Sequence, residues 1–294
     1  MSSPRFLVTG ANGQLGRRVI DTLLGTISAP QISALVRGAD AAAALSARGI
    51  QAHVGDYGRP ETLAPALAGV DRVLLISSSE IGRRTPQHRN VIAAAREAGV
   101  QFLAYTSLLH ADISPLGLAE EHRQTEAALR ESGVPFALLR NGWYTENYAA
   151  SIPAALAHSA LLGSAGDGRI SSASRADYAA AAAAVLTADT PAANQVYELA
   201  GDEAYTLTEF AAEIARQSGK AVAYRDLPEA DYKAALLGAG LPEPFAALLA
   251  DSDAGAAKDA LFDDSRTLSR LIGRPTTPYA ETIGDTLKAS RPER

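Results

Sequence analysis

Short apolar runs rich in β-branched residues recur along the first half of this chain, and a segment with helical periodicity follows each run. This alternation predicts β-α-β units, in which helices join parallel strands and cover the sheet. The sequence therefore indicates a doubly wound α/β fold with a parallel sheet. The predicted strands are residues 5–9, 32–37, 50–54, 72–77, 101–107 and 135–140.

The alternation loosens beyond Asn141, although residues 195–199 have the pattern of one further strand and residues 207–217 that of a helix. A chain of 294 residues is long for one ordinary domain and short for two. We expect a nucleotide-binding domain over residues 1–145, to which a segment at 175–200 returns. A smaller, mainly helical domain is expected over the remainder, 146–294.

A glycine-rich loop lies between the first predicted strand and the first predicted helix. Glycine at such a junction lets backbone N–H groups approach a pyrophosphate, and the helix N-terminus adds a favourable dipole. The spacing is Gly-x-x-Gly-x-x-Gly, and its position after a strand is what gives it meaning. We therefore predict a Rossmann domain whose dinucleotide contacts include Gly10, Ala11, Asn12, Gly13, Gln14, Leu15 and Gly16.

The end of the second predicted strand bears on which dinucleotide binds. NAD-selective sites carry an acidic residue there that binds the ribose 2′-OH, whereas this chain has Arg37. Because a guanidinium can pair with a 2′-phosphate, the sequence favours NADPH, with NADH as the weaker alternative. Arg17 and Arg18 can assist, and a solvated surface arginine is the competing interpretation of Arg37. Asp56, ending the third strand, is either a partner of the adenine amino group or a turn residue.

The proton donor that short-chain dehydrogenases use is absent. Those enzymes place a lysine four residues after a tyrosine, which lowers the pKa of the phenol. In this chain no tyrosine has a lysine at that spacing, and all four lysines lie at or beyond Lys220. His122, on the helix after the fifth strand, is a candidate catalytic residue or a packed histidine, and its spacing supports both. Thr106, at the end of the fifth strand, is either a cofactor ligand or a cap.

The absence of this dyad constrains the chemistry. Hydride addition to a ketone yields a strongly basic alkoxide that needs a positioned acid. Hydride addition to a quinone yields a phenolate whose conjugate acid should have a pKa of about 10, so water can protonate it. A nicotinamide site of this kind is better matched to quinone reduction, or to sensing the cofactor without turnover.

Composition excludes several other classes. The net charge of -6 disfavours nucleic acid as a partner, and the lack of cysteine excludes disulfides and thiolate chemistry. Neither a signal peptide nor a membrane-spanning run is recognisable, so we expect a cytoplasmic protein without membrane insertion. Neither His88 nor His110 has a second metal-binding residue at the i, i+4 spacing of a helical zinc site, so no metal site is expected. The assembly state stays open, with a homodimer as one alternative.

Longer motifs carry a family resemblance over essentially the whole chain. Together with the glycine loop they resemble the NmrA-like branch of atypical short-chain dehydrogenases, in particular the bacterial NAD(P)H:quinone oxidoreductases of type 2. Among the segments that carry the resemblance are Leu75–Glu80, Pro86–Asn90, Tyr105–Asp112, Ser114–Leu118, Leu139–Tyr148, Arg175–Ala179, Tyr197–Asp202, Leu261–Ser265 and Leu271–Thr277.

The resemblance implies hydride transfer from NADPH to a small quinone, giving the hydroquinone. It also implies further site residues. Asn147 would orient a quinone oxygen, and the rings of Trp143, Tyr144 and Tyr148 would offer faces for stacking or else pack internally. Tyr144 and Asn147 join His122 as the catalytic candidates. The residues implied to line the cofactor are Arg37, Ser77, Ser78, Asn141, Gly142, Trp143, Tyr144, Thr145 and Glu146.

Two other functions compete with quinone reduction. One is an NmrA-like redox sensor that binds NADP(H) and regulates a protein partner without turnover. The other is reduction of an imine or an enone. A Rossmann domain that lacks the acid dyad and carries a helical extension is compatible with each of them.

Overall fold

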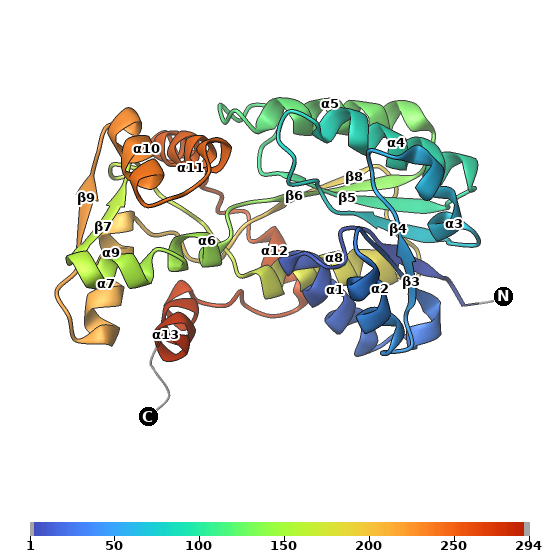
Figure 1. Ribbon diagram of the computed structural model, residues 1–294, viewed down its shortest axis with the longest axis horizontal. Helices are drawn as coiled ribbons and strands as arrows, with labels where there is room; N and C mark the ends of the chain where they lie inside the picture. The colour runs from blue at the N-terminus through green and yellow to red at the C-terminus, as the bar shows by residue number, and fades with distance from the viewer. Residues whose placement is uncertain (1–2, 291–294) are drawn as a thin grey trace. The chain divides into compact units, whose positions relative to one another are not determined.

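The computed structural model describes residues 3–290, and its elements are labelled in Figure 1. The chain divides into two compact units. The first unit runs to Ala111 and also contains Glu120–Asn141 and Arg175–Tyr197. The second unit comprises Asp112–Ala119, Gly142–Ser174 and the chain from Glu198 onward. From the sequence we placed the domain boundary after residue 145 and the returning segment at 175–200. In the structure the corresponding parts of the first unit end at residue 141 and cover residues 175–197.

A seven-stranded sheet forms the centre of the first unit, in the order β3-β2-β1-β4-β5-β6-β8. Neighbouring strands from β3 through β6 are parallel. This confirms the predicted doubly wound Rossmann fold, in which the strand order reverses between β1 and β4. The strands are β1 (Phe6–Val8), β2 (Ile32–Val36), β3 (Gln51–Val54), β4 (Arg72–Leu75), β5 (Phe102–Leu108), β6 (Phe136–Asn141) and β8 (Gln195–Leu199).

Helices cover both faces of this sheet (Figure 1). On one face α1 packs against α8 and α2 lies beside them; α3, α4 and α5 cover the other. Apolar side chains of α3, α4 and α5 meet the strands in one buried cluster around Leu75, Leu103 and Tyr105. The helices are α1 (Gln14–Leu24), α2 (Ala39–Ser46), α3 (Ala64–Leu67), α4 (Arg84–Glu97), α5 (Ala119–Ser132) and α8 (Arg175–Thr187). Two 3₁₀ turns lie at Ala29–Gln31 and Pro60–Thr62.

Glycine is required at two positions of the loop between β1 and α1. Gly10 has a φ of +58°, in the left-handed region that side chains disfavour. A Cβ at Gly16 would collide with the carbonyl oxygen of Gly10 and lie 2.8 Å from the Cα of Ala11. The first turn of α1 can therefore pack directly against the end of β1 only if residue 16 has no side chain.

The second unit contains helices and a two-stranded parallel sheet, β7 (Ala160–Gly163) with β9 (Ala223–Asp226). The sequence did not predict these two short strands. Rings of Tyr148, Tyr205 and Phe210 pack together in its core. The helices of this unit are α6 (Thr145–Ala149), α7 (Ile152–His158), α9 (Leu207–Ser218), α10 (Glu229–Gly238), α11 (Glu243–Ala256), α12 (Thr267–Ile272) and α13 (Tyr279–Ala289).

The substitution Gly16→Ala tests the contact between α1 and the end of β1. The added methyl group must push the helix away from Gly10, so the free energy of unfolding should fall by about 1–3 kcal/mol. Chemical denaturation followed by circular dichroism measures this loss. Gly38→Ala is the control, because a Cβ there meets nothing within 4 Å. An equal effect of both substitutions would contradict this assignment.

Candidate functional site

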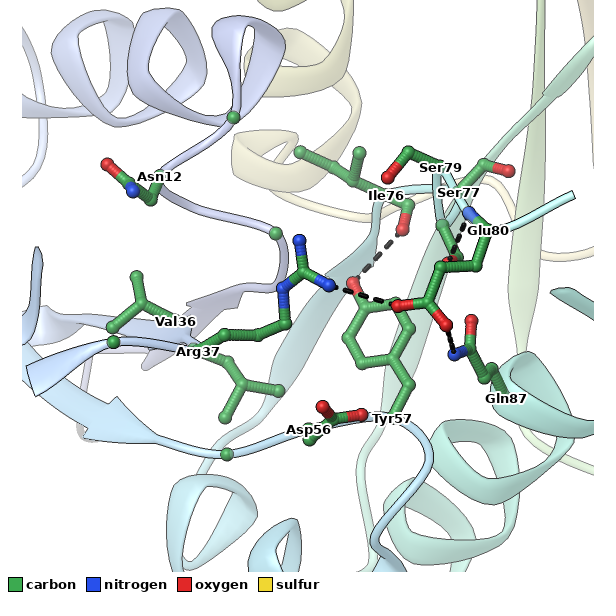
Figure 2. A pocket seen from close by; sticks show the side chains of 16 residues that line it. Asn12, Val36, Arg37, Asp56, Tyr57, Ile76, Ser77, Ser79, Glu80 and Gln87 are labelled. Atoms are coloured by element: carbon green, nitrogen blue, oxygen red, sulfur yellow. Dashed lines mark hydrogen bonds and ion pairs between the residues drawn. The ribbon is translucent and has the colours of Figure 1, made fainter. Parts of the chain in front are cut away.

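A cavity of about 320 Å³ opens in the first unit at the carboxyl ends of its strands. Its walls come from the glycine loop and from the residues that follow β2, β3 and β4 (Figure 2). Ligands of open α/β sheets bind at this edge, beside the point where the strand order reverses. The lining residues are Gly10, Asn12, Gly13, Leu35, Val36, Arg37, Gly38, Gly55, Asp56, Tyr57, Ile76, Ser77, Ser78, Ser79, Glu80 and Gln87.

The side chains of Arg37 and Glu80 point toward one another in this cavity (Figure 2). Arg37 Nη1 lies 3.0 Å from Glu80 Oε1. The arginine side chain is 69% exposed and that of the glutamate 32%, so water screens the pair and its strength is modest. Arg37 is therefore an accessible cation at the end of β2, where NAD-selective sites carry a carboxylate.

Tyr57 lies between the ends of β1 and β4. Its hydroxyl group donates to the carbonyl oxygen of Ile76 at 3.0 Å and contacts the hydroxyl group of Thr9. Burial raises the pKa of Tyr57, so the phenol stays protonated at neutral pH. Its hydroxyl group thus links the residues that follow β1 and β4, and the side chain forms part of the cavity wall.

His88, on α4, holds the segment that follows β4. Its Nε2 accepts a 2.9 Å hydrogen bond from the backbone N–H of Ser78, and its Nδ1 lies 2.9 Å from Thr125 Oγ1. The hydroxyl group of Thr125 donates to the carbonyl oxygen of Glu121, which leaves it free to accept from Nδ1–H. The ring is therefore neutral. Burial, with a smaller contribution from Arg84, lowers the pKa of His88 to about 3.

His122 is buried and does not line the cavity. Its Nδ1 is 2.8 Å from the hydroxyl group of Tyr105. Burial above all, with nearby Arg84 and His88, lowers the pKa of His122 well below its usual value. The imidazole is neutral at pH 7, so it holds no imidazolium proton for a reaction. A catalytic part for His122 stays a prediction without support from this geometry.

A buried ion pair ties the ends of β5 and β6 to α5. Glu126 accepts hydrogen bonds from Arg140 Nε at 2.9 Å and Nη2 at 2.8 Å, and from Ser107 Oγ at 2.6 Å. Although burial opposes it, these bonds lower the pKa of Glu126. At the neighbouring strand ends, Thr106 Oγ1 accepts from the backbone N–H of Ser77 at 2.9 Å. The carboxyl edge of the sheet is thus held rigidly by polar groups.

The structure brings part of the sequence-predicted cofactor residues together in this cavity. Two of them also have structural partners, since Asp56 Oδ1 accepts from the N–H of Gly58 at 2.7 Å and Asn12 Oδ1 accepts from Arg17. The turn function of Asp56 is thereby shown, and its contact with adenine stays a prediction. The predicted residues that line the cavity are Gly10, Asn12, Gly13, Arg37, Asp56, Ser77 and Ser78.

Other predicted residues of the first unit lie outside this lining. Ala11 and Leu15 are buried, and the N–H of Ala11 bonds to the carbonyl oxygen of Leu35 at 3.2 Å. Asn141 Oδ1, at the end of β6, is buried without a hydrogen-bond partner among residues 3–290. The lining also omits Gln14, Gly16 and Thr106.

The predicted segment from Gly142 to Asn147 belongs to the second unit. Within that unit the backbone of Trp143 and Thr145 pairs with Ala173. The ring of Trp143 packs on that of Tyr148, whose hydroxyl group donates to Asp253 at 2.8 Å. Tyr148 is therefore a buried packing residue here. The remaining predicted residues, Gly142, Tyr144, Glu146 and Asn147, occupy the start of α6 and the turn before it.

Several residues that shape the cavity have no function that we predicted from the sequence. Glu80, Tyr57 and His88 are the most important of them. An acidic residue soon after the end of β4 was a usable signal for Glu80, since that edge faces the ligand. Among residues 3–290 the structure contains no cluster of side chains suited to hold a metal ion. None of the helices in that range combines the length and apolarity needed to cross a bilayer.

Comparison with known proteins assigns the family. Residues 10–189 match the model of the NAD(P)H-binding family, so the chain belongs to that family. Over 94% of its length the chain is 60% identical to Quinone oxidoreductase 2 of Escherichia coli, of which the match covers 96%. It is 31% identical, again over 94% of its length, to 96% of the NAD(P)H azoreductase of Xenophilus azovorans.

Solved structures agree with these relatives. The crystal structure of the NADPH-dependent quinone oxidoreductase from Escherichia coli in complex with NADPH has a TM-score of 0.93 and 58% identity, covering 96% of this chain and 99% of that one. The triphenylmethane reductase of Citrobacter sp. complexed with NADP(H) has a TM-score of 0.90 and 36% identity, with the same coverage. These matches confirm the resemblance inferred from the sequence motifs.

The low pKa of His88 predicts an acid-sensitive fold. The unfolded chain binds this proton near pH 6.5 and the folded protein only near pH 3. Between these values the unfolded state binds more protons, so the free energy of unfolding decreases as the pH falls below 6.5, by up to about 1.4 kcal/mol per pH unit from this residue. Chemical denaturation of wild-type protein and His88→Gln at pH 7, 6 and 5 should show a shallower pH dependence for the variant.

His158→Gln is the matched control, because His158 is exposed. It should keep the wild-type pH dependence. If His88→Gln kept the same steep decrease, the neutral buried histidine would not be the cause.

Proposed function

We propose that this chain is an NADPH-dependent quinone oxidoreductase. The observation that carries the proposal is its 60% identity, over 94% of its length, to a quinone oxidoreductase. The cavity of the first unit supports it independently, because it combines a glycine loop with Arg37 at the end of β2.

The residues around the cavity fit a phosphorylated dinucleotide. Gly10 and Gly13 line the cavity without a side chain that would keep a pyrophosphate from the backbone, and the first turn of α1 carries no acidic residue that would repel it. Arg37 is accessible to a 2′-phosphate, which its planar guanidinium can bind through two N–H groups. Asn141 Oδ1 is a buried acceptor to which no group of residues 3–290 donates, and it is suited to the carboxamide N–H groups of a nicotinamide.

When bound, NADPH supplies the hydride. The residues of this chain hold the cofactor, and the neutral His88 keeps the segment at Ser78 in place. Since no tyrosine of the chain has a lysine four residues on, it lacks the pair with which short-chain dehydrogenases protonate a ketone oxygen. A quinone is reduced to a phenolate that water can protonate, so this site suits a quinone better.

For the quinone itself we assign Asn147 to a quinone oxygen and Tyr144 to the face of the ring. Both assignments come from the motif that spans Leu139–Tyr148. An amide N–H of Asn147 can donate to an oxygen that gains negative charge during reduction, which stabilises the product-like state. We further propose that the enzyme acts in the cytoplasm; the homodimer stays open.

The direct test is consumption of NADPH in the presence of 1,4-benzoquinone or menadione. We expect quinone-dependent oxidation of NADPH, with hydroquinone formed in equal amount. Absorbance at the nicotinamide band measures the rate, and chromatography measures the product. Tight binding of NADPH without quinone-dependent turnover would instead support the sensor function and overturn the proposal.

A second prediction concerns Asn147. Asn147→Ala should lower kcat for the quinone by about 10²-fold, as loss of one donor to a developing oxyanion does. The dissociation constant of NADPH should change little, because Asn147 is not among the residues that line the cavity. Steady-state kinetics and calorimetric titration separate the two effects. Normal turnover in the variant would remove Asn147 from the site.

A further inference from the structure

Glu80 is the acidic residue of the cavity whose side chain pairs with Arg37. Its Oε1 lies 3.0 Å from Arg37 Nη1, and Figure 2 shows the two side chains facing each other in the cavity. The same guanidinium is the group that we assign to the 2′-phosphate of NADPH. A carboxylate and a phosphate would therefore compete for one cation.

The segment after β4 holds Glu80 in this position. The backbone N–H of Glu80 donates to Ser78 Oγ at 3.1 Å, and Gln87 Nε2 donates to its Oε2 at 2.9 Å. Arg83 Nη1 lies 3.4 Å from the same Oε2. Because Gln87 and Arg83 remain as partners, the carboxylate keeps one hydrogen bond and a counter-ion when Arg37 turns away.

We propose that Glu80 limits the preference for NADPH over NADH by competing with the 2′-phosphate for Arg37. The inference rests on the proposed function, in which Arg37 binds the 2′-phosphate of NADPH. A phosphate carries close to two negative charges against one for the carboxylate and so displaces it. NADH has no 2′-phosphate, so it binds without breaking the pair. Glu80 therefore weakens NADPH binding and leaves NADH binding unchanged.

The size of the effect follows from the exposure of the pair. Exposed ion pairs are weak, and removing this competitor should strengthen NADPH binding by about twofold to fivefold. Glu80→Gln is the suitable variant, because the amide has nearly the same shape and can still accept a hydrogen bond from Gln87 while losing its charge.

The experiment is a double-mutant cycle on the whole chain. Dissociation constants of NADPH and NADH are measured by calorimetric titration, at one ionic strength, for wild type, Glu80→Gln, Arg37→Ala and the double variant. We expect Glu80→Gln to lower the dissociation constant of NADPH by about twofold to fivefold and to leave that of NADH unchanged. The double variant should bind NADPH no more tightly than Arg37→Ala does, because the guanidinium for which Glu80 and the 2′-phosphate compete is absent.

Glu97→Gln is the matched control, since it removes the same charge from an exposed position at the end of α4. It should change neither constant. Thermal unfolding of each variant shows that it is folded.

Three results would overturn the inference. They are no gain in Glu80→Gln, an equal gain for NADH, or a gain that persists without Arg37. If Arg37→Ala weakens NADPH selectively while Glu80→Gln has no effect, only the competition is wrong. If Arg37→Ala weakens both cofactors equally, the proposed reading of the 2′-phosphate is wrong as well.

Discussion

The close approach of α1 to the end of β1 is the constraint on which the site depends. It requires glycine at residue 16, where any Cβ would collide with the backbone of Gly10 and Ala11. This contact brings the first turn of the helix to the carboxyl edge of the sheet. The glycine loop, the cation at Arg37 and the segment after β4 then surround one cavity. Rossmann domains bind phosphates through this arrangement.

Buried polar groups hold the carboxyl ends of β4, β5 and β6 in place. His88 fixes the backbone at Ser78, and Glu126 joins the ends of β5 and β6 through Arg140 and Ser107. Such networks are stable only when each member is satisfied, which keeps the histidine neutral and the carboxylate charged. Because the buried histidine must stay neutral, the fold becomes less stable at acidic pH. The benefit is a rigid edge against which a cofactor can be oriented.

The sequence predicted those features that depend on neighbouring residues. Strands β1–β6 follow from periodicity, and the loop and Arg37 from their position at strand ends. Strands β7 and β9 were missed, because the apolar residues 160–163 fit a helix equally well and residues 223–226 are mostly exposed. The pair Arg37–Glu80 joins residues 43 positions apart, so the order of strands in the sheet decides it and local sequence does not.

A nicotinamide site without an acid dyad should reduce acceptors whose products need no positioned proton donor. Comparing kcat/KM for 1,4-naphthoquinone with that for 1-tetralone, a ketone of nearly the same shape, tests it most directly. General acids contribute about 10²–10⁴-fold to such reductions. With NADPH, we expect turnover of the quinone and a kcat/KM for the ketone that is at least about 10²-fold lower. Comparable values for both acceptors would contradict it.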